Sequence, residues 1–166
     1  MASVRCAFWA AVLGAAAATD SSAVVTARIM AQFDTDSSGD WDNTRRLLAI
    51  DGLIVYPGAE LPVIDAVRLG GPGCISATAN LNGSGIANVI DLCHAGKWDE
   101  AEAAYKPVKD VRLLFQDYAP IPAQKALLAR RTGDARWNNL RPPFRGISDE
   151  KRDSLAASLA PYGMTF

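Results

Sequence analysis

Cysteine and histidine are scarce in this chain of 166 residues. The three cysteines, Cys6, Cys74 and Cys93, lie far apart without a CxxC pair, and His94 is the single histidine. An odd number of isolated cysteines excludes a disulfide framework and a structural zinc site. We therefore expect no metal, and a reducing compartment such as the cytoplasm.

The chain also lacks a charge imbalance. Its 17 lysine and arginine residues balance 18 acidic residues, giving a net charge of −1. Near-neutral charge argues against bulk binding to nucleic acid or to an anionic membrane. The apolar run over residues 6–18 is too short to cross a bilayer as an ordinary helix. We expect neither nucleic acid nor a membrane as a partner.

The first 23 residues differ in kind from the rest. They contain one early arginine, an apolar run and alanines that resemble a signal-peptidase site. Two interpretations stay open for this segment. It is either a cleaved export signal, which would place the protein outside the cytoplasm, or an alanine-rich stretch from a wrong start or a shifted reading frame.

The stretch FDTDSSGDWDNT, residues 33–44, has the letters of a calcium loop. Asp34 and Asp36 occupy the first and third positions of an EF-hand loop. Arg45 stands at the twelfth position, where calcium needs a bidentate carboxylate. An exported calcium-binding protein is therefore the weakest of three functional interpretations.

After residue 40, short apolar runs alternate with amphipathic segments. The runs GLIVYP (52–57) and GCISATAN (73–80) are typical of strands buried on both faces. Ser84 and Ser148 are expected as helix N-caps. Strand–helix–strand–helix order with short links predicts parallel strands and an α/β fold. Helices are predicted over residues 41–50, 60–71, 84–96, 98–115, 121–133 and 148–163.

Two features with functional appeal have plainer structural interpretations. His94 falls in the last turn of a predicted helix, where a cation complements the helix dipole, and no GxSxG elbow exists to recruit it. A group of arginines beside two aromatic residues is interpreted as a solvated helix end and linker rather than a nucleic-acid patch. This group comprises Arg130, Arg131, Arg136, Arg141 and Arg145 with Trp137 and Phe144.

Four segments, in order, carry a family resemblance: DSSGDWDNTRRLL (36–48), VYPGAELPVIDAVRLGGPGCISATAN (55–80), IPAQKALL (121–128) and RPPF (141–144). They resemble the C-terminal half of the dihydrodipicolinate synthase / N-acetylneuraminate lyase family. The resemblance implies a partial (β/α)8 TIM barrel, about strands six to eight, followed by C-terminal helices. It implies lyase chemistry, as a Schiff-base aldolase or dehydratase, on a 2-oxo acid such as pyruvate, with no metal and no cofactor.

The resemblance places the catalytic lysine of the family at Thr35. In the family, a lysine amine condenses with the 2-oxo carbon, and the protonated imine stabilises the carbanion that follows. A threonine hydroxyl forms no imine. The family's carboxylate-binding Gly-Thr-Thr-Gly-Glu segment and its proton-relay tyrosine also have no counterpart between Met1 and Phe33. We expect no catalytic residue in this chain and no activity from it alone.

The resemblance does carry over five substrate-binding positions. Ser37 lies two residues past the lysine position. Gly58 and Glu60 follow the predicted seventh strand. Ile75 and Ser76 lie on the predicted eighth strand, where a backbone carbonyl and a side chain face the substrate.

The predicted organisation has three parts: an unrelated alanine-rich lead over 1–35, the C-terminal βα units of a TIM barrel over 36–96, and a helical segment over 97–166. A frameshift or truncated gene is the favoured explanation for the abrupt change after residue 35. The predicted function is an inactive fragment of a Schiff-base lyase. The alternative is a non-catalytic half-barrel used for ligand binding or protein association. Open strand edges predict self-association.

Overall fold

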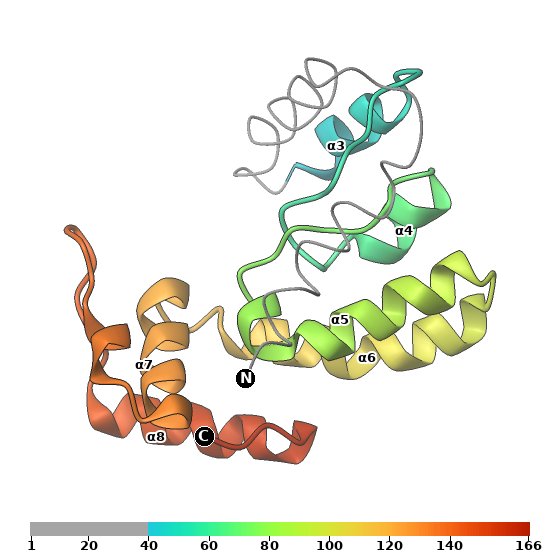
Figure 1. The fold of residues 1–166 in the computed structure, drawn as a ribbon. Helices are drawn as coiled ribbons and strands as arrows, with labels where there is room; N and C mark the ends of the chain where they lie inside the picture. Colours follow the sequence, from blue (N-terminus) through green and yellow to red (C-terminus); the bar gives the residue numbers. More distant parts are fainter. Residues whose placement is uncertain (1–39) are drawn as a thin grey trace.

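The computed structural model describes residues 40–166, which form a series of helices joined by extended segments (Figure 1). The lead over residues 1–35, which includes Thr35, and Ser37 lie outside the described residues. The elements are α3 (Trp41–Leu48), α4 (Val63–Arg68), α5 (Ala79–His94), α6 (Trp98–Leu114), α7 (Pro120–Thr132), η1 (Ala135–Asn138), α8 (Asp149–Leu159) and η2 (Ala160–Tyr162).

Local sequence signals explain where several helices begin and end. The Asp40 carboxylate accepts hydrogen bonds from the backbone N–H groups of Asp42 and Asn43 at the start of α3. The Ser148 hydroxyl caps α8 by accepting from the Lys151 N–H at 3.3 Å, as predicted. Gly133 ends α7 with φ 68°, a left-handed conformation that glycine adopts without strain.

The two predicted strands are not regular strands within residues 40–166. The segments 53–57 and 73–76 are extended and meet at one backbone hydrogen bond, from Ile75 N–H to the Pro57 carbonyl at 2.8 Å. A parallel ladder requires a series of evenly spaced bonds between adjacent strands. Regular strands at 52–57 and 73–80 are therefore not confirmed among the described residues, although extended segments do alternate with α4 and α5 in the predicted order.

Helix α5 begins earlier than predicted. It starts at Ala79, and the Asn82 N–H donates a hydrogen bond to the carbonyl of the N-cap Thr78 at 2.8 Å. Residues 79–80 are therefore helical rather than part of a strand. Asn82 itself has non-helical angles, φ −118° and ψ 36°, which kink the helix. Ser84 thus lies inside α5, and its prediction as the N-cap is wrong.

Two apolar clusters hold the helices together, and α6 contributes to both. The first cluster joins α4, α5 and α6, which lie close together in Figure 1. The second joins the end of α6 to α7 and α8. The most deeply buried members of the two clusters are Val63, Val89 and Ala101 in the first and Phe115, Ala123, Leu127, Leu155 and Leu159 in the second.

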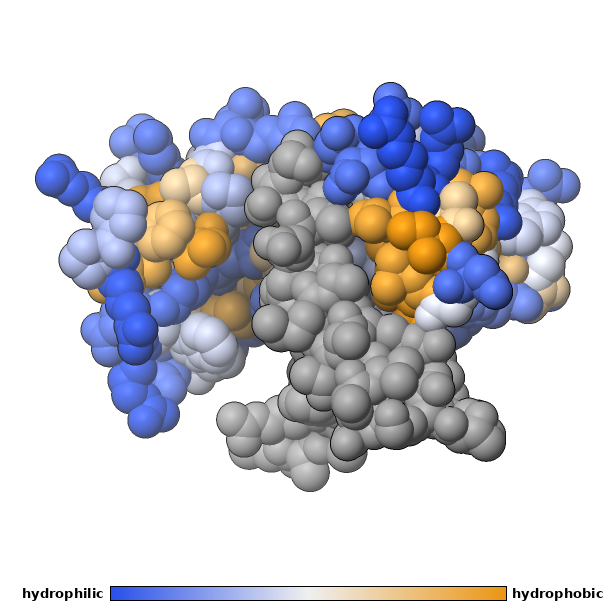
Figure 2. Space-filling view, turned by 90° about the horizontal axis from the view of Figure 1, so that it is seen from above, coloured by the Kyte–Doolittle hydropathy of each residue, from blue (hydrophilic) through white to orange (hydrophobic). Residues whose placement is uncertain are grey.

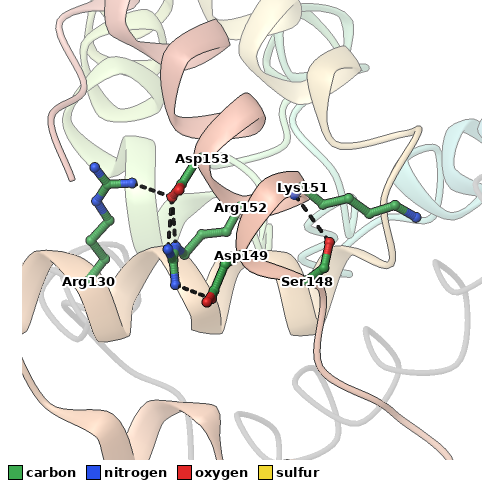
Figure 3. A network of polar contacts seen from close by, with 6 residues as sticks. All are labelled: Arg130, Ser148, Asp149, Lys151, Arg152 and Asp153. Carbon is green, nitrogen blue, oxygen red and sulfur yellow. Dashed lines mark hydrogen bonds and ion pairs between the residues drawn. The ribbon is translucent and has the colours of Figure 1, made fainter.

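Surface ion pairs link α7 to α8. Arg130 pairs with Asp153 at 2.6 Å, and Arg152 pairs with both Asp153 and Asp149 (Figure 3). Exposed pairs of this kind contribute little stability. Arg130 and Arg136 each pair with an aspartate, which favours the interpretation of this arginine-rich region as a solvated surface.

Apolar side chains gather on the face of the molecule seen from above (Figure 2). Large exposed apolar residues near α3 and α4 include Ile50, which is 53% exposed, and Leu69, which is 47% exposed.

Among residues 40–166, none of the helices combines the length and hydropathy that a membrane span requires.

Candidate functional site

Glu60 is the buried centre of the site. It lies between the extended segment 53–57 and α4, and only 1% of the residue is exposed. Its backbone carbonyl accepts from the Val63 N–H at 3.1 Å, so the turn that leads into α4 fixes its position. Burying a carboxylate is costly unless other groups bind it.

Two hydroxyl groups, from the end of the second extended segment and from the N-cap of α5, bind this carboxylate. Ser76 donates to one oxygen of Glu60, and Thr78 donates to the other. The two hydroxyl oxygens lie 2.8 Å apart, and the Thr78 N–H donates to the Ser76 oxygen at 3.3 Å. The resemblance had placed Glu60 and Ser76 at one site, and the structure brings them together.

A cation from α6 completes the cluster. The Nε atom of Arg112 lies 3.9 Å from Glu60 Oε2, and its side chain is 26% exposed. The sequence reasoning missed both Arg112 and Thr78, although each carried a signal. Arg112 follows the buried Val108 by one helical turn. Thr78 follows Ser76 by two residues, and both hydroxyls bind the same carboxylate.

Tyr105 of α6 contacts the same turn at Leu61, the residue after Glu60. Its hydroxyl donates to the Leu61 carbonyl at 2.6 Å. Burial, followed by the negative charge of Glu60, raises the pKa of Tyr105 to about 12. The phenol is therefore a neutral donor at physiological pH, and one face of α6 presents Tyr105 and Arg112 to the Glu60 turn.

The other predicted binding residues lie in the same segments but make no hydrogen bond to this cluster. Gly58 is exposed, two residues before Glu60. Ile75 is half-buried, and its N–H bond to Pro57 joins the segments that carry Gly58 and Ser76. Ser37 lies outside the described residues.

The described residues offer no centre for a metal. They contain no group of three histidine, cysteine or acidic side chains placed to hold an ion. Asp40, inside the calcium-like stretch, caps α3, and Asp42 pairs with Arg45 at 3.4 Å. His94 ends α5 as predicted, and its Nε2 lies 3.1 Å from the Pro72 carbonyl.

Comparison with known proteins adds to this geometry. The model of the dihydrodipicolinate synthetase family matches residues 25–161. The chain belongs to this family. The curated 4-hydroxy-tetrahydrodipicolinate synthase of Buchnera aphidicola subsp. Cinara cedri is 28% identical over 123 residues, which are 72% of this chain and 41% of that protein. The chain thus spans less than half the length of this family relative.

Solved structures of the family agree. Dihydrodipicolinate synthase from Agrobacterium tumefaciens is 30% identical, with a TM-score of 0.58 over 74% of this chain and 40% of its own. N-acetylneuraminate lyase from Fusobacterium nucleatum, solved with pyruvate, has a TM-score of 0.64 over 75% of this chain and 42% of its own. At 22% identity, this second likeness shows the fold alone.

Proposed function

We propose that this chain carries the C-terminal part of a lyase that acts on a 2-oxo acid. The observation that carries the proposal is the contact between Glu60 and Ser76. The resemblance assigns both residues to substrate binding at successive strands, and their side chains meet across sixteen positions of sequence. A buried polar cluster at the ends of two such segments is a typical place for a small-ligand site.

The reaction of intact family members needs a group that we do not find at the matching position of this chain. Imine formation needs a lysine amine, and Thr35 occupies the position that the resemblance gives to that lysine. We propose that the chain does not form an imine by itself, and that pyruvate or a related 2-oxo acid is the ligand class. We also keep the expected cytoplasmic location as part of this proposal.

The proposed architecture keeps the two parts predicted after residue 35. Residues 36–96 supply βα units equivalent to about strands six to eight of a TIM barrel, and residues 97–166 supply the helices that follow. Family membership supports this division. The alternation of extended segments with α4 and α5 supports it as well.

A pyruvate titration, monitored through backbone amide resonances, tests the ligand class. We expect the amides of residues 58–60 and 74–78 to shift together and to saturate. Ser76→Ala should weaken these shifts. The control Ser158→Ala removes a hydroxyl that donates a hydrogen bond to the Ser154 carbonyl in α8, and it should leave the shifts unchanged. An absence of shifts in both segments up to about 50 mM pyruvate would contradict the proposal.

Association is a second candidate role, favoured by the exposed apolar residues near α3 and α4. Ile50, Leu61 and Leu69 are all more than one-third exposed. Large exposed apolar surfaces mark sites of protein contact. We propose that copies of the chain associate through this side.

A further inference from the structure

Arg112 differs from Arg152, the other partly buried arginine among residues 40–166. The side chains of Arg112 and Arg152 are 26% and 27% exposed, respectively. Arg152 makes three hydrogen bonds to Asp149 and Asp153. The guanidinium of Arg112 makes no hydrogen bond with any residue from 40 to 166, and it forms an ion pair with Glu60 at 3.9 Å. Five N–H donors therefore gather beside a buried polar cluster without a hydrogen-bond acceptor there.

The ion pair with Glu60 does not account for this arrangement. In a well-aligned pair of a guanidinium and a carboxylate, the distance between the donor nitrogen and the acceptor oxygen is about 2.7–2.9 Å. The Nε atom of Arg112 lies 3.9 Å from Glu60 Oε2, beyond this range, whereas Ser76 and Thr78 bind the two Glu60 oxygens directly. The position of Arg112 in the last turn of α6 favours a cation there, but it supplies no partner for the N–H groups.

We infer that Arg112 binds the carboxylate of a small anionic ligand at the edge of the Glu60–Ser76–Thr78 cluster. A planar guanidinium presents paired donors that match the two oxygens of a carboxylate. The contact with Glu60 holds the side chain in place and partly offsets its charge, so a free anion binds weakly and a ligand needs further contacts. The choice of a 2-oxo acid as this ligand rests on the proposed function. The anion site itself rests on the geometry of Arg112.

The test observes the arginine Nε–H resonances of the wild-type protein during titration with pyruvate at constant ionic strength. We expect the Arg112 resonance to shift and saturate, while the Arg152 resonance stays in place because its donors are already used. Pyruvamide, which keeps the 2-oxo group but has no carboxylate, should leave the Arg112 resonance unmoved. An equal shift with pyruvamide, or no shift up to about 50 mM pyruvate, would overturn the inference.

Variants give an independent direction of change. Glu60→Gln removes the neighbouring negative charge while keeping the size of the side chain, so the affinity for pyruvate should rise by at least about threefold. Arg112→Lys keeps a charge but loses the paired donors, so the affinity should fall by a similar factor. Arg152→Lys is the matched control and should change nothing. Weaker binding in Glu60→Gln would contradict a competition between Glu60 and the ligand for Arg112.

The two proposals fail separately. Saturating shifts of the amides in 58–60 and 74–78, with a silent Arg112 resonance, would leave the proposed function standing and end the inference about Arg112. A carboxylate-dependent shift at Arg112 that acetate produces as strongly as pyruvate would keep the anion site and remove its link to 2-oxo acids.

Discussion

Ser76 donates a hydrogen bond to the carboxylate of Glu60, across sixteen positions of sequence and one intervening helix. This contact joins the turn before α4 to the segment before α5. Thr78 reinforces the contact at the second carboxylate oxygen, and Arg112 adds a cation from α6. One buried side chain therefore connects three parts of the chain that the sequence separates.

Replacing Glu60 should reveal how much this connection stabilises the fold. Glu60→Ala leaves the hydroxyls of Ser76 and Thr78 without their acceptor, so the free energy of unfolding should fall by about 1–3 kcal/mol. Glu60→Gln keeps an acceptor and should cost less. Chemical denaturation measures both changes.

The matched control is Glu102→Ala. The Glu102 side chain is 50% exposed and pairs with Arg68 at the surface, so its loss should cost less than about 1 kcal/mol. Equal losses at Glu60 and Glu102 would show that the buried cluster has no special structural role.

Tyr105 should make stability depend on alkaline pH. Its pKa is raised from 10.0 to about 12 in the folded protein, chiefly by burial. The folded state therefore keeps the phenolic proton that the unfolded state loses, so the stabilisation is complete below pH 10 and is lost as the pH rises towards 12. Denaturation midpoints measured between these pH values should fall more steeply for the wild type than for Tyr105→Phe.

Tyr118→Phe serves as the control, because Tyr118 packs against the second apolar cluster rather than the Glu60 turn. It should follow the wild-type pH profile. Parallel profiles for Tyr105→Phe and the wild type would contradict the assigned role of the Tyr105 hydroxyl.

The sequence predicts the helical part of this fold better than the site. Caps and apolar spacing place α6, α7 and α8 within a few residues, because these are local signals. The extended segments had the composition of buried strands, but strand formation depends on neighbouring strands that a local pattern does not contain. The helical turn that begins at Thr78 joins the rest of α5 at the kink at Asn82. For this reason α5 begins before Ser84 rather than at it.

The site was predicted through resemblance rather than through periodicity. Glu60 and Ser76 came from matching positions, and the two side chains share a hydrogen bond. Their role in binding substrate stays a prediction. Arg112 was missed because its spacing from Val108 indicates the packed face of α6 but does not specify that this face lies against the Glu60 turn. Thr35 and Ser37 remain predictions, since both lie outside the described residues.

Self-association should be measurable in solution. The apolar side chains exposed near α3 and α4 are expected to be buried between copies, so sedimentation at micromolar concentration should detect dimers or larger species. Leu69→Lys should shift the population towards monomer. Leu113→Lys, on the exposed side of α6, is the matched control and should not. A monomer that binds no hydrophobic dye would contradict this prediction.

Borohydride trapping bears directly on the role of Thr35. The protein is incubated with pyruvate, reduced with borohydride and weighed as an intact chain, with an imine-forming family enzyme as the positive control. We predict no added mass, because the resemblance assigns the position of the imine-forming lysine to Thr35, and a hydroxyl forms no imine. A stoichiometric adduct that maps to any lysine of this chain would contradict that prediction.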